Sequence, residues 1–224
     1  LPDLPGVVST EQDGDRLRPE ACQSPVWDTG LAVLALRDSG LGPEHPALVR
    51  AAEWLEREEV TVEGDWAVRL PELAPGGWAF EFENDLYPDV DDTAVVALAL
   101  RRCHRAHEAV DRGLAWMAGM QSSSGGWGAF DADNEAFWLY KLPFCDFGKV
   151  TDEPSADVTA HAIEALAHER GFDEEVRRGL DWLLAEQDAD GSWFGRWGVN
   201  HVYGTAAALP ALEACGLEPE HRAV

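Results

Sequence analysis

Residues 91–100 read DDTAVVALAL, and three other stretches of the chain repeat this pattern. In each stretch a Thr is followed six residues later by Ala-Leu, within a run that is apolar on nearly all sides. The four stretches are WDTGLAVLAL, DDTAVVALAL, DVTAHAIEAL and YGTAAALPAL, with their threonines at Thr29, Thr93, Thr159 and Thr205. A helix that is hydrophobic all round is buried, so each run predicts an inner helix.

A second repeated element alternates with these apolar runs. It reads RAAEWLEREEVTVEGDW, RGLAWMAGMQSSSGGW and RGLDWLLAEQDADGSW, starting at Arg50, Arg112 and Arg178. Each stretch is typical of an amphipathic helix followed by a Gly-containing turn and a Trp, here Trp66, Trp127 and Trp193. Because these helices carry charge, we expect them outside the apolar ones. The alternation predicts an all-α fold, an α/α barrel (toroid) of inner and outer helices.

The segments that follow the first and last apolar runs also match. GLGPEHPALV begins at Gly40 and GLEPEHRAV begins at Gly216. The second copy stops where another outer helix should begin, which would leave one face of the helical stack unpaired. We therefore expect residues 1–224 to form one incomplete α/α-barrel domain of a longer protein.

The composition indicates a globular chain with few cationic side chains. Of the 224 residues, 46% are hydrophobic and ten are Trp, while 17 Lys and Arg face 42 Asp and Glu, which gives a net charge of −25. Nucleic acid is excluded as a partner because phosphate binding needs a cationic footprint. The cysteines form no C-x-x-C pair, so we expect no structural zinc site. They are Cys22, Cys103, Cys145 and Cys215.

Alignment of the four runs on their threonines predicts a ring of side chains around a common axis. The residues two positions before each Thr are Trp27, Asp91, Asp157 and Tyr203. Two acids and two aromatics at equivalent positions suggest chemistry rather than packing. One turn beyond Asp157, His161 occupies an otherwise apolar level, where it can pair with Asp157 or with Asp91 across the ring.

Three acids, Asp89, Asp91 and Asp92, directly precede one of the apolar runs. A helix N-cap and the helix dipole explain one acid at this position, but not three. Like charges beside apolar surface favour the protonated form of at least one carboxyl group. The sequence therefore predicts an acid that faces an apolar space. Two loops follow the Trp turns, GGWAFEF at residues 76–82 and GGWGAFDADNEAFWLYKLPFCDFG at residues 125–148. The second is unusually apolar for a loop, so we expect it to fold over or line something nonpolar.

The motifs DVDDTA, the R-G-x-x-W repeats and DGSWFGRWGVNHVYGT together resemble those of bacterial squalene–hopene cyclases, which are class II triterpene cyclases. The resemblance runs over essentially the whole chain. It implies a partial catalytic α/α barrel, with an inserted second barrel and further repeats lying outside residues 1–224. It also implies a monotopic homodimer on the cytoplasmic side of the bacterial cell membrane. The activity implied is the cyclisation of squalene to hopene or hopanol, without a metal or cofactor.

Matched residue by residue, the resemblance makes Asp91 the proton donor to the terminal alkene. Asp89 and Asp92 match the flanking carboxylates, His161 matches the hydrogen-bond partner of the acid, and Asp157 is the acid of the same motif. Further matches are Trp27 and Asp28 in the W-D-T segment, Phe80, Phe130, Trp197 and Tyr203 among the cavity aromatics, and Phe144 and Cys145 at the constriction of the substrate channel. Many relatives carry Tyr at the position of Phe130 and Gln at the position of Glu59.

Other functions remain open from the sequence. A class II cyclase of another polyprene, of curcumene or diterpene type, shares the D-x-D-D motif. A non-catalytic helical-repeat module that binds lipid would not require that motif. A glycosidase using Asp91 and Asp157 would need an open polar cleft, and a prenyltransferase-like toroid would need a zinc cluster. Because cavity walls would be missing, residues 1–224 alone are expected to be inactive.

Overall fold

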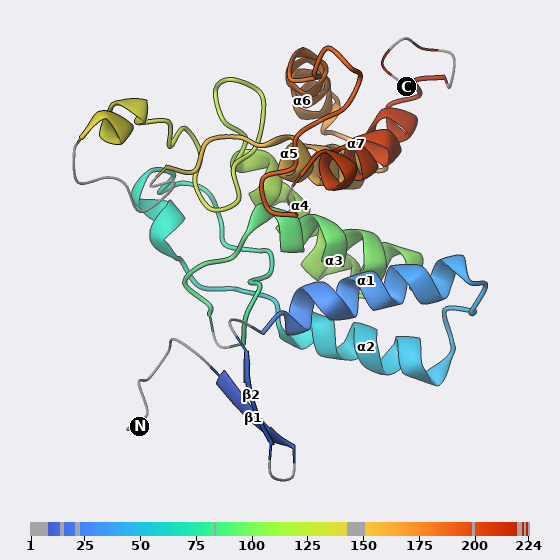
Figure 1. Cartoon of the computed structure of the whole chain (residues 1–224). Coiled ribbons are helices and arrows are strands. Elements are labelled where there is room, and N and C mark those ends of the chain that lie inside the picture. The colour runs from blue at the N-terminus through green and yellow to red at the C-terminus, as the bar shows by residue number, and fades with distance from the viewer. Residues whose placement is uncertain are drawn as a thin grey trace.

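The computed structural model is helical, with one short β-hairpin before the helices (Figure 1). It describes residues 9–13, 16–20, 23–82, 84–142, 151–198, 200–218, 221 and 223. The four apolar runs form α1 (Pro25–Asp38), α3 (Val90–Arg102), α5 (Ala156–Ala167) and α7 (His201–Ala214). The charged repeats form α2 (Pro46–Arg57), α4 (His107–Gly119) and α6 (Asp173–Ala185). The predicted all-α architecture of alternating helices is confirmed.

The helices pack as two layers that follow one another along the chain. Helix α1 packs against α3, α3 against α5, and α5 against α7, which makes these four the inner layer. Helices α2, α4 and α6 each cover the inner helix that precedes them, and α2 and α4 also contact the next one. In Figure 1 the pairs appear in this order, from blue α1 and α2 to red α7. None of the described helices combines the length and hydropathy that a membrane crossing requires.

Burial of the inner helices matches the prediction in the middle of the stack and differs at its ends. Every residue of α3 from Val90 to Leu100 is buried. In α1 and α7, however, Leu31 is 42% exposed and Val202 is 87% exposed. Each of these two helices has an inner neighbour on one side only among the described residues. An apolar helix face is buried only where another element covers it.

A tryptophan after each outer helix ties that helix to the next inner one. The backbone N–H of Trp127 donates to Oγ1 of Thr159 at 2.9 Å, and its indole Nε1–H donates to the carbonyl oxygen of Met117 at 2.8 Å. One buried side chain thereby connects α4 with α5. The equivalent pairs are Trp78 with Thr93 and Leu55, and Trp193 with Thr205 and Leu183, at 2.6–3.1 Å.

The same tryptophan also docks on the following outer helix. A Cβ added to Gly179 of α6 would lie 2.6 Å from the Trp127 ring, and one added to Gly113 of α4 would lie 2.7 Å from Trp78. Only glycine leaves room for the indole at this position. The R-G-x-x-W repeat is therefore explained by contact between consecutive repeats.

The prediction that Trp66 closes the first outer repeat is wrong, because Trp78 has that role. Trp66 lies in the short 3-10 helix η1 (Asp65–Val68), where it packs edge-on against Trp116 with ring centroids 6.0 Å apart. Its Nε1 has no hydrogen-bond partner among the described residues. The first repeat carries an insertion before its turn, which is Gly76-Gly77-Trp78. Gly64-Asp65-Trp66 within that insertion has the same Gly-x-Trp spacing, so the sequence does not distinguish the two.

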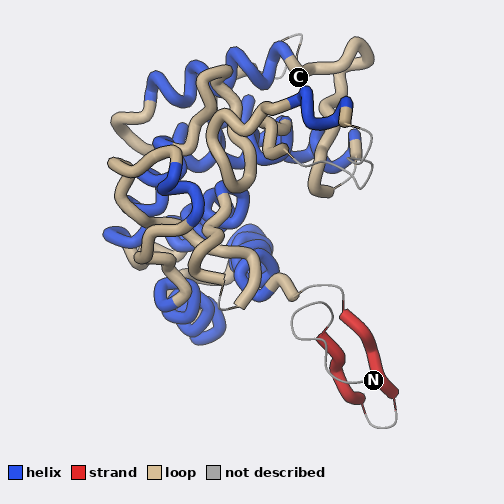
Figure 2. The backbone as a smooth tube through the Cα atoms, turned by 90° about the vertical axis from the view of Figure 1, so that its left-hand side faces the viewer, coloured by secondary structure: helices blue, strands red, loops and turns tan. Residues whose placement is uncertain are grey.

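The hairpin consists of β1 (Ser9–Asp13) and β2 (Arg16–Glu20), which pair antiparallel from Ser9 opposite Glu20 to Asp13 opposite Arg16. The all-α prediction did not include it. Its strands read STEQD and RLRPE and lack the alternation of apolar and polar residues that predicts a half-buried strand. Figures 1 and 2 show the hairpin apart from the helices.

We expect Gly179→Ala to lower the thermal unfolding midpoint. At an exposed helix position this change stabilises by about 1 kcal/mol through helix propensity, but here the new methyl group would meet a fully buried indole. Overpacking typically costs about 1–3 kcal/mol, so the net change should be a loss of stability. Gly42→Ala is the control, because a Cβ there meets nothing within 4 Å. An unchanged midpoint for Gly179→Ala would contradict the docking role of Trp127.

Candidate active site

The N-terminal ends of three inner helices open onto a cavity of about 440 Å³. Trp27 comes from α1, Asp91 from α3 and Tyr203 from α7. The remaining lining residues belong to the loops around these helix ends and to the start of α3: Phe80, Glu81, Asn84, Tyr87, Asp89, Asp92, Ala129, Phe130, Trp197 and Gly198. Aromatic rings and four carboxyl groups, three of them from residues 89–92, thus share one space.

Three of the four ring positions predicted from the repeat meet in this cavity, and the fourth is placed differently. Asp157 does not line the cavity, and its carboxyl group is fully buried at the start of α5. Its Oδ2 accepts a hydrogen bond from the backbone N–H of Trp197 at 2.8 Å, while Oδ1 has no hydrogen-bond partner among the described residues. Asp157 therefore holds the backbone of a cavity aromatic.

The three clustered acids are buried at the N-terminus of α3. Asp89, Asp91 and Asp92 are 4%, 8% and 1% exposed. Asp89 caps the helix, because its Oδ1 accepts a hydrogen bond from the backbone N–H of Asp92 at 2.7 Å. The cap explains why an acid stands at position 89, and all three acids also line the cavity.

Burial determines the protonation of this cluster. Burial, with the charges of Asp89 and Asp91, raises the pKa of Asp92 to about 11. Burial also raises the pKa of Asp89 to about 7, against the opposing effect of its hydrogen bonds to Asp92. The cluster therefore holds at least one proton at neutral pH.

His161 pairs with Asp91 rather than with Asp157. Its Nδ1 lies 2.6 Å from Oδ1 of Asp91, and its ring lies between Trp27 and Tyr203, with centroid distances of 5.9 and 6.3 Å. Burial lowers the pKa of His161, but the charge of Asp91 and the hydrogen bond to it outweigh burial, so the pKa is raised above the ordinary value. Burial and then the nearby acids raise the pKa of the Tyr203 hydroxyl, which stays neutral. The pair favours an imidazolium beside the acid cluster.

The other predicted site residues divide into those that reach the cavity and those that do not. Phe80, Phe130 and Trp197 line it, and the Phe130 and Trp197 rings meet edge to face at 5.9 Å. Asp28 is exposed and outside the lining, where its carboxylate accepts a hydrogen bond from Ser24 Oγ at 3.0 Å. The predicted constriction residues Phe144 and Cys145 lie outside the described residues.

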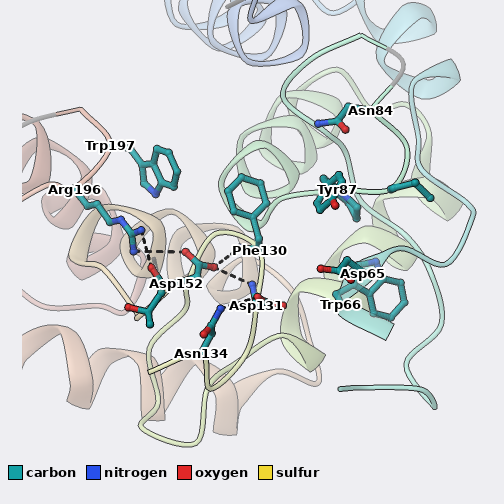
Figure 3. A pocket seen from close by; sticks show the side chains of 13 residues that line it. Asp65, Trp66, Asn84, Tyr87, Phe130, Asp131, Asn134, Asp152, Arg196 and Trp197 are labelled. Carbon is teal, nitrogen blue, oxygen red and sulfur yellow. Dashed lines mark hydrogen bonds and ion pairs between the residues drawn. The ribbon is translucent and has the colours of Figure 1, made fainter. Parts of the chain in front are cut away.

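Sequence reasoning missed a second pocket beside the cavity. It has a volume of about 370 Å³ and a more polar lining that includes Asp131, Asp152 and Arg196 (Figure 3). Asp152 stands in the stretch TDEPSAD, which is typical of an ordinary helix start, so no sequence pattern distinguishes it as a site residue. Among the residues that the structure describes, no group of three or more His, Cys, Asp or Glu is placed to hold a metal ion.

Comparisons with known proteins show the family of the chain. Residues 23–224 match the sequence model of the squalene-hopene cyclase C-terminal domain. The squalene–hopene cyclase of Alicyclobacillus acidocaldarius is 55% identical over 205 residues, which cover 88% of this chain and 32% of that protein. The corresponding enzyme of Zymomonas mobilis is 44% identical, over 96% of this chain and 34% of that protein. The chain thus spans about a third of the length of these relatives.

Two further matches extend the comparison. Dammaradiene synthase of the fern Dryopteris crassirhizoma is 44% identical over 88% of this chain and 31% of its own length. Among solved structures, the type II terpene cyclase MstE from Scytonema superposes with a TM-score of 0.63 at 21% identity, over 96% of this chain and 55% of that chain. The structural match supports the fold, an all-α part of an α/α barrel.

We expect Asp92→Asn to stabilise the protein increasingly as pH rises. An acid whose pKa is raised by folding destabilises the folded state above its unfolded pKa of about 4, and the penalty grows with pH until the folded pKa is reached. For Asp92 that window extends to about pH 11. The gain in unfolding midpoint of the variant over the parent should therefore be larger at about pH 8.5 than at about pH 5.

The control for this measurement is Asp85→Asn, which removes an exposed carboxylate from the loop before α3. Its effect on the midpoint should be the same at both pH values. An equal effect of Asp92→Asn at the two pH values would show that Asp92 does not carry the buried proton.

Proposed function

Because the chain belongs to the squalene-hopene cyclase C-terminal domain family, we propose that it supplies the acid and part of the cavity of an enzyme that cyclises squalene. The reaction would begin with protonation of the terminal alkene and lead to hopene or hopanol-type pentacyclic triterpenes. The observation that supports this most directly is the short contact between His161 and Asp91, in a carboxyl cluster that opens onto aromatic rings.

Asp91 is the proposed proton donor. Protonation of an isolated alkene requires a carboxyl group that holds a proton and yet forms a stabilised carboxylate. The neighbouring acids and burial favour the protonated cluster, whereas the N-terminus of α3 and the His161 imidazolium stabilise the charge that remains on Asp91 after transfer. Asp91 also combines a place in the cavity lining with the hydrogen bond to His161.

Asp92 and Asp89 are proposed as supporting acids. With its pKa raised to about 11, Asp92 remains neutral at physiological pH and adds no second negative charge beside Asp91. Asp89 fixes the start of α3 through its cap, and its pKa of about 7 allows it to exchange a proton near neutrality. The cluster can thus return a proton to Asp91 after each turnover.

The aromatic lining suits the carbocations that follow protonation. A desolvated aromatic face stabilises a cation by about 2 kcal/mol or more. Trp27, Phe80, Phe130, Trp197 and Tyr203 all line the cavity, and the raised pKa of Tyr203 keeps its hydroxyl from acting as an anionic base. We further propose that the whole protein is a monotopic homodimer on the cytoplasmic side of the cell membrane. The insolubility of squalene in water supports the membrane attachment.

A second candidate is the formation of another polycyclic triterpene. Dammaradiene synthase is 44% identical to this chain, as is the squalene–hopene cyclase of Zymomonas mobilis, so overall similarity does not fix the product. Both candidates share initiation by Asp91. They differ in how far the cation proceeds before it is quenched.

The test uses the whole protein to which this chain belongs, solubilised in detergent and incubated with squalene. We expect a pentacyclic product by gas chromatography–mass spectrometry, unchanged by EDTA. Asp91→Asn should lower kcat by about a hundredfold or more, because removal of a general acid costs at least that much.

Asp85→Asn again provides a control for the loss of one carboxylate, with kcat expected to stay at the parent value. A tetracyclic product would favour the second candidate. Unchanged turnover by Asp91→Asn would remove Asp91 as the acid, and no cyclised product from the parent would refute the proposed substrate.

A further inference from the structure

The polar pocket and the aromatic cavity share one wall. Four residues line both spaces: Phe130, Trp197, Asn84 and Tyr87. The Phe130 and Trp197 rings meet edge to face with centroids 5.9 Å apart. On the cavity side lie Asp91 and Tyr203, and on the other side lie Asp131, Asn134 and Arg196, among other polar groups. The two rings therefore separate an apolar reaction space from a pocket whose lining can hold water.

Asp152 fixes the Phe130 side of this wall. Its carboxyl group is 7% exposed, and Oδ2 accepts hydrogen bonds from the backbone N–H of Phe130 at 2.6 Å and of Asp131 at 2.9 Å. Its own N–H donates to the carbonyl oxygen of Asn134 at 3.1 Å. Figure 3 shows Asp152 between Arg196 and this backbone segment. The contact holds the backbone and leaves the Phe130 ring free to face the cavity.

Arg196 joins the other side of the wall to the same carboxyl group. Its Nη1 lies 3.6 Å from Oδ1 of Asp152, and its guanidinium carbon lies 5.3 Å from the centroid of the Trp197 ring. Arg196 is itself held by hydrogen bonds to the carbonyl oxygens of Thr151 at 3.1 Å and Glu153 at 3.3 Å. A planar cation beside an indole favours one orientation of the ring.

We propose that Asp152 and Arg196 are positioning residues that hold Phe130 and Trp197 together as a partition between the polar pocket and the cyclisation cavity. This inference rests on the proposed function. The partition determines whether a cyclic carbocation loses a proton or meets water. Neither Asp152 nor Arg196 touches the reacting atoms, so their effect appears in the products rather than only in the rate.

Entry of water into the cavity would lead to a specific side reaction. When water reaches a partly cyclised cation, its oxygen donates an electron pair to the cationic carbon, a C–O bond forms, and one proton passes to a second water molecule. The net reaction adds one water to the polyprene and yields an alcohol with fewer rings. In the competing course the remaining alkenes close further rings by C–C bond formation, and the last cation then loses a proton from a C–H bond to a base, with no water incorporated.

The test compares products of the whole protein and of Asp152→Asn in water enriched in oxygen-18. Asparagine retains the size of the side chain but ends the attraction to Arg196. The ratio of labelled, incompletely cyclised alcohol to pentacyclic product should rise roughly tenfold, which corresponds to about 1.4 kcal/mol of lost discrimination. Arg196→Lys should shift the ratio in the same direction, because lysine retains the charge and lacks the planar group.

Asp131→Asn is the matched control. It removes a carboxylate from the same polar pocket, where the Asp131 side chain accepts a hydrogen bond from Asn134. The backbone N–H of residue 131, which donates to Asp152, is unaffected by the substitution. The product ratio should equal that of the parent. A fall in total turnover with an unchanged product ratio for Asp152→Asn would reduce Asp152 to a structural residue and overturn the inference.

A crystal structure of Asp152→Asn separates this inference from the proposed function. The wall should open, with a longer distance between the Phe130 and Trp197 centroids than the 5.9 Å found here. An unchanged wall would overturn the inference even if the enzyme makes hopene. If the wall opens and the parent does not cyclise squalene, the proposed function fails while the positioning role stands.

Discussion

The two hydrogen bonds of each repeat tryptophan are the interaction on which the rest of the structure depends. The backbone N–H of Trp78 donates to Oγ1 of Thr93 on α3, and its indole N–H donates to the carbonyl oxygen of Leu55 near the end of α2. Thr93 in turn donates its hydroxyl proton to the carbonyl oxygen of Asp89 at 2.6 Å. One hydroxyl group therefore fixes both the Trp turn and the start of α3. Because side chains on a helix have fixed directions, this contact also orients Asp91, two residues earlier, toward the cavity.

This constraint explains why buried acids are tolerated at the start of α3. Burying carboxyl groups is unfavourable, and the raised pKa values of Asp89 and Asp92 show that folding shifts them toward the neutral form. The surrounding framework offsets this cost through fully buried indoles, including Trp78 and Trp116, and through the Asp89 cap. The packing of the repeat and the Asp89 cap thus stabilise the acid cluster together.

Most of the fold could be predicted from the sequence, because the residues that repeat are the ones that make these contacts. Alignment on the threonines predicted that Trp27, Asp91 and Tyr203 share one cavity, as they do. It also predicted Asp91 and Asp157 as the two possible partners of His161, of which Asp91 is the one bonded. It could not show that Trp78 replaces Trp66, since each Trp stands two residues after a glycine. Only tertiary contacts distinguish them: Trp78 fits against Gly113 and bonds Thr93 and Leu55.

Other features depend on contacts that have no periodic signal. The position of Asp28 in the W-D-T segment suggested a site residue, but the helix turns it outward, because residues one apart on a helix do not share a face. Asp152 and Arg196 are 44 residues apart in the chain and meet only because α5 and the loop before α7 are neighbours in space. The hairpin of β1 and β2 follows the same rule, since its polar strands pair through the backbone.

The wall between the two pockets shows how a polar group can serve an apolar reaction. A carbocation cavity needs rings with a free face toward the cavity, and the contacts that hold Phe130 and Trp197 do not use a polar atom of either ring. Phenylalanine has no such atom, and the indole N–H of Trp197 is not engaged by Asp157 or Arg196, which act on its backbone and its ring face. Asp152 and Asp157 each hold the backbone N–H of one wall residue from behind. Because the carboxyl groups of Asp152 and Asp157 bond the backbone and lie outside the cavity lining, they hold the two rings strongly while the cavity surface stays apolar.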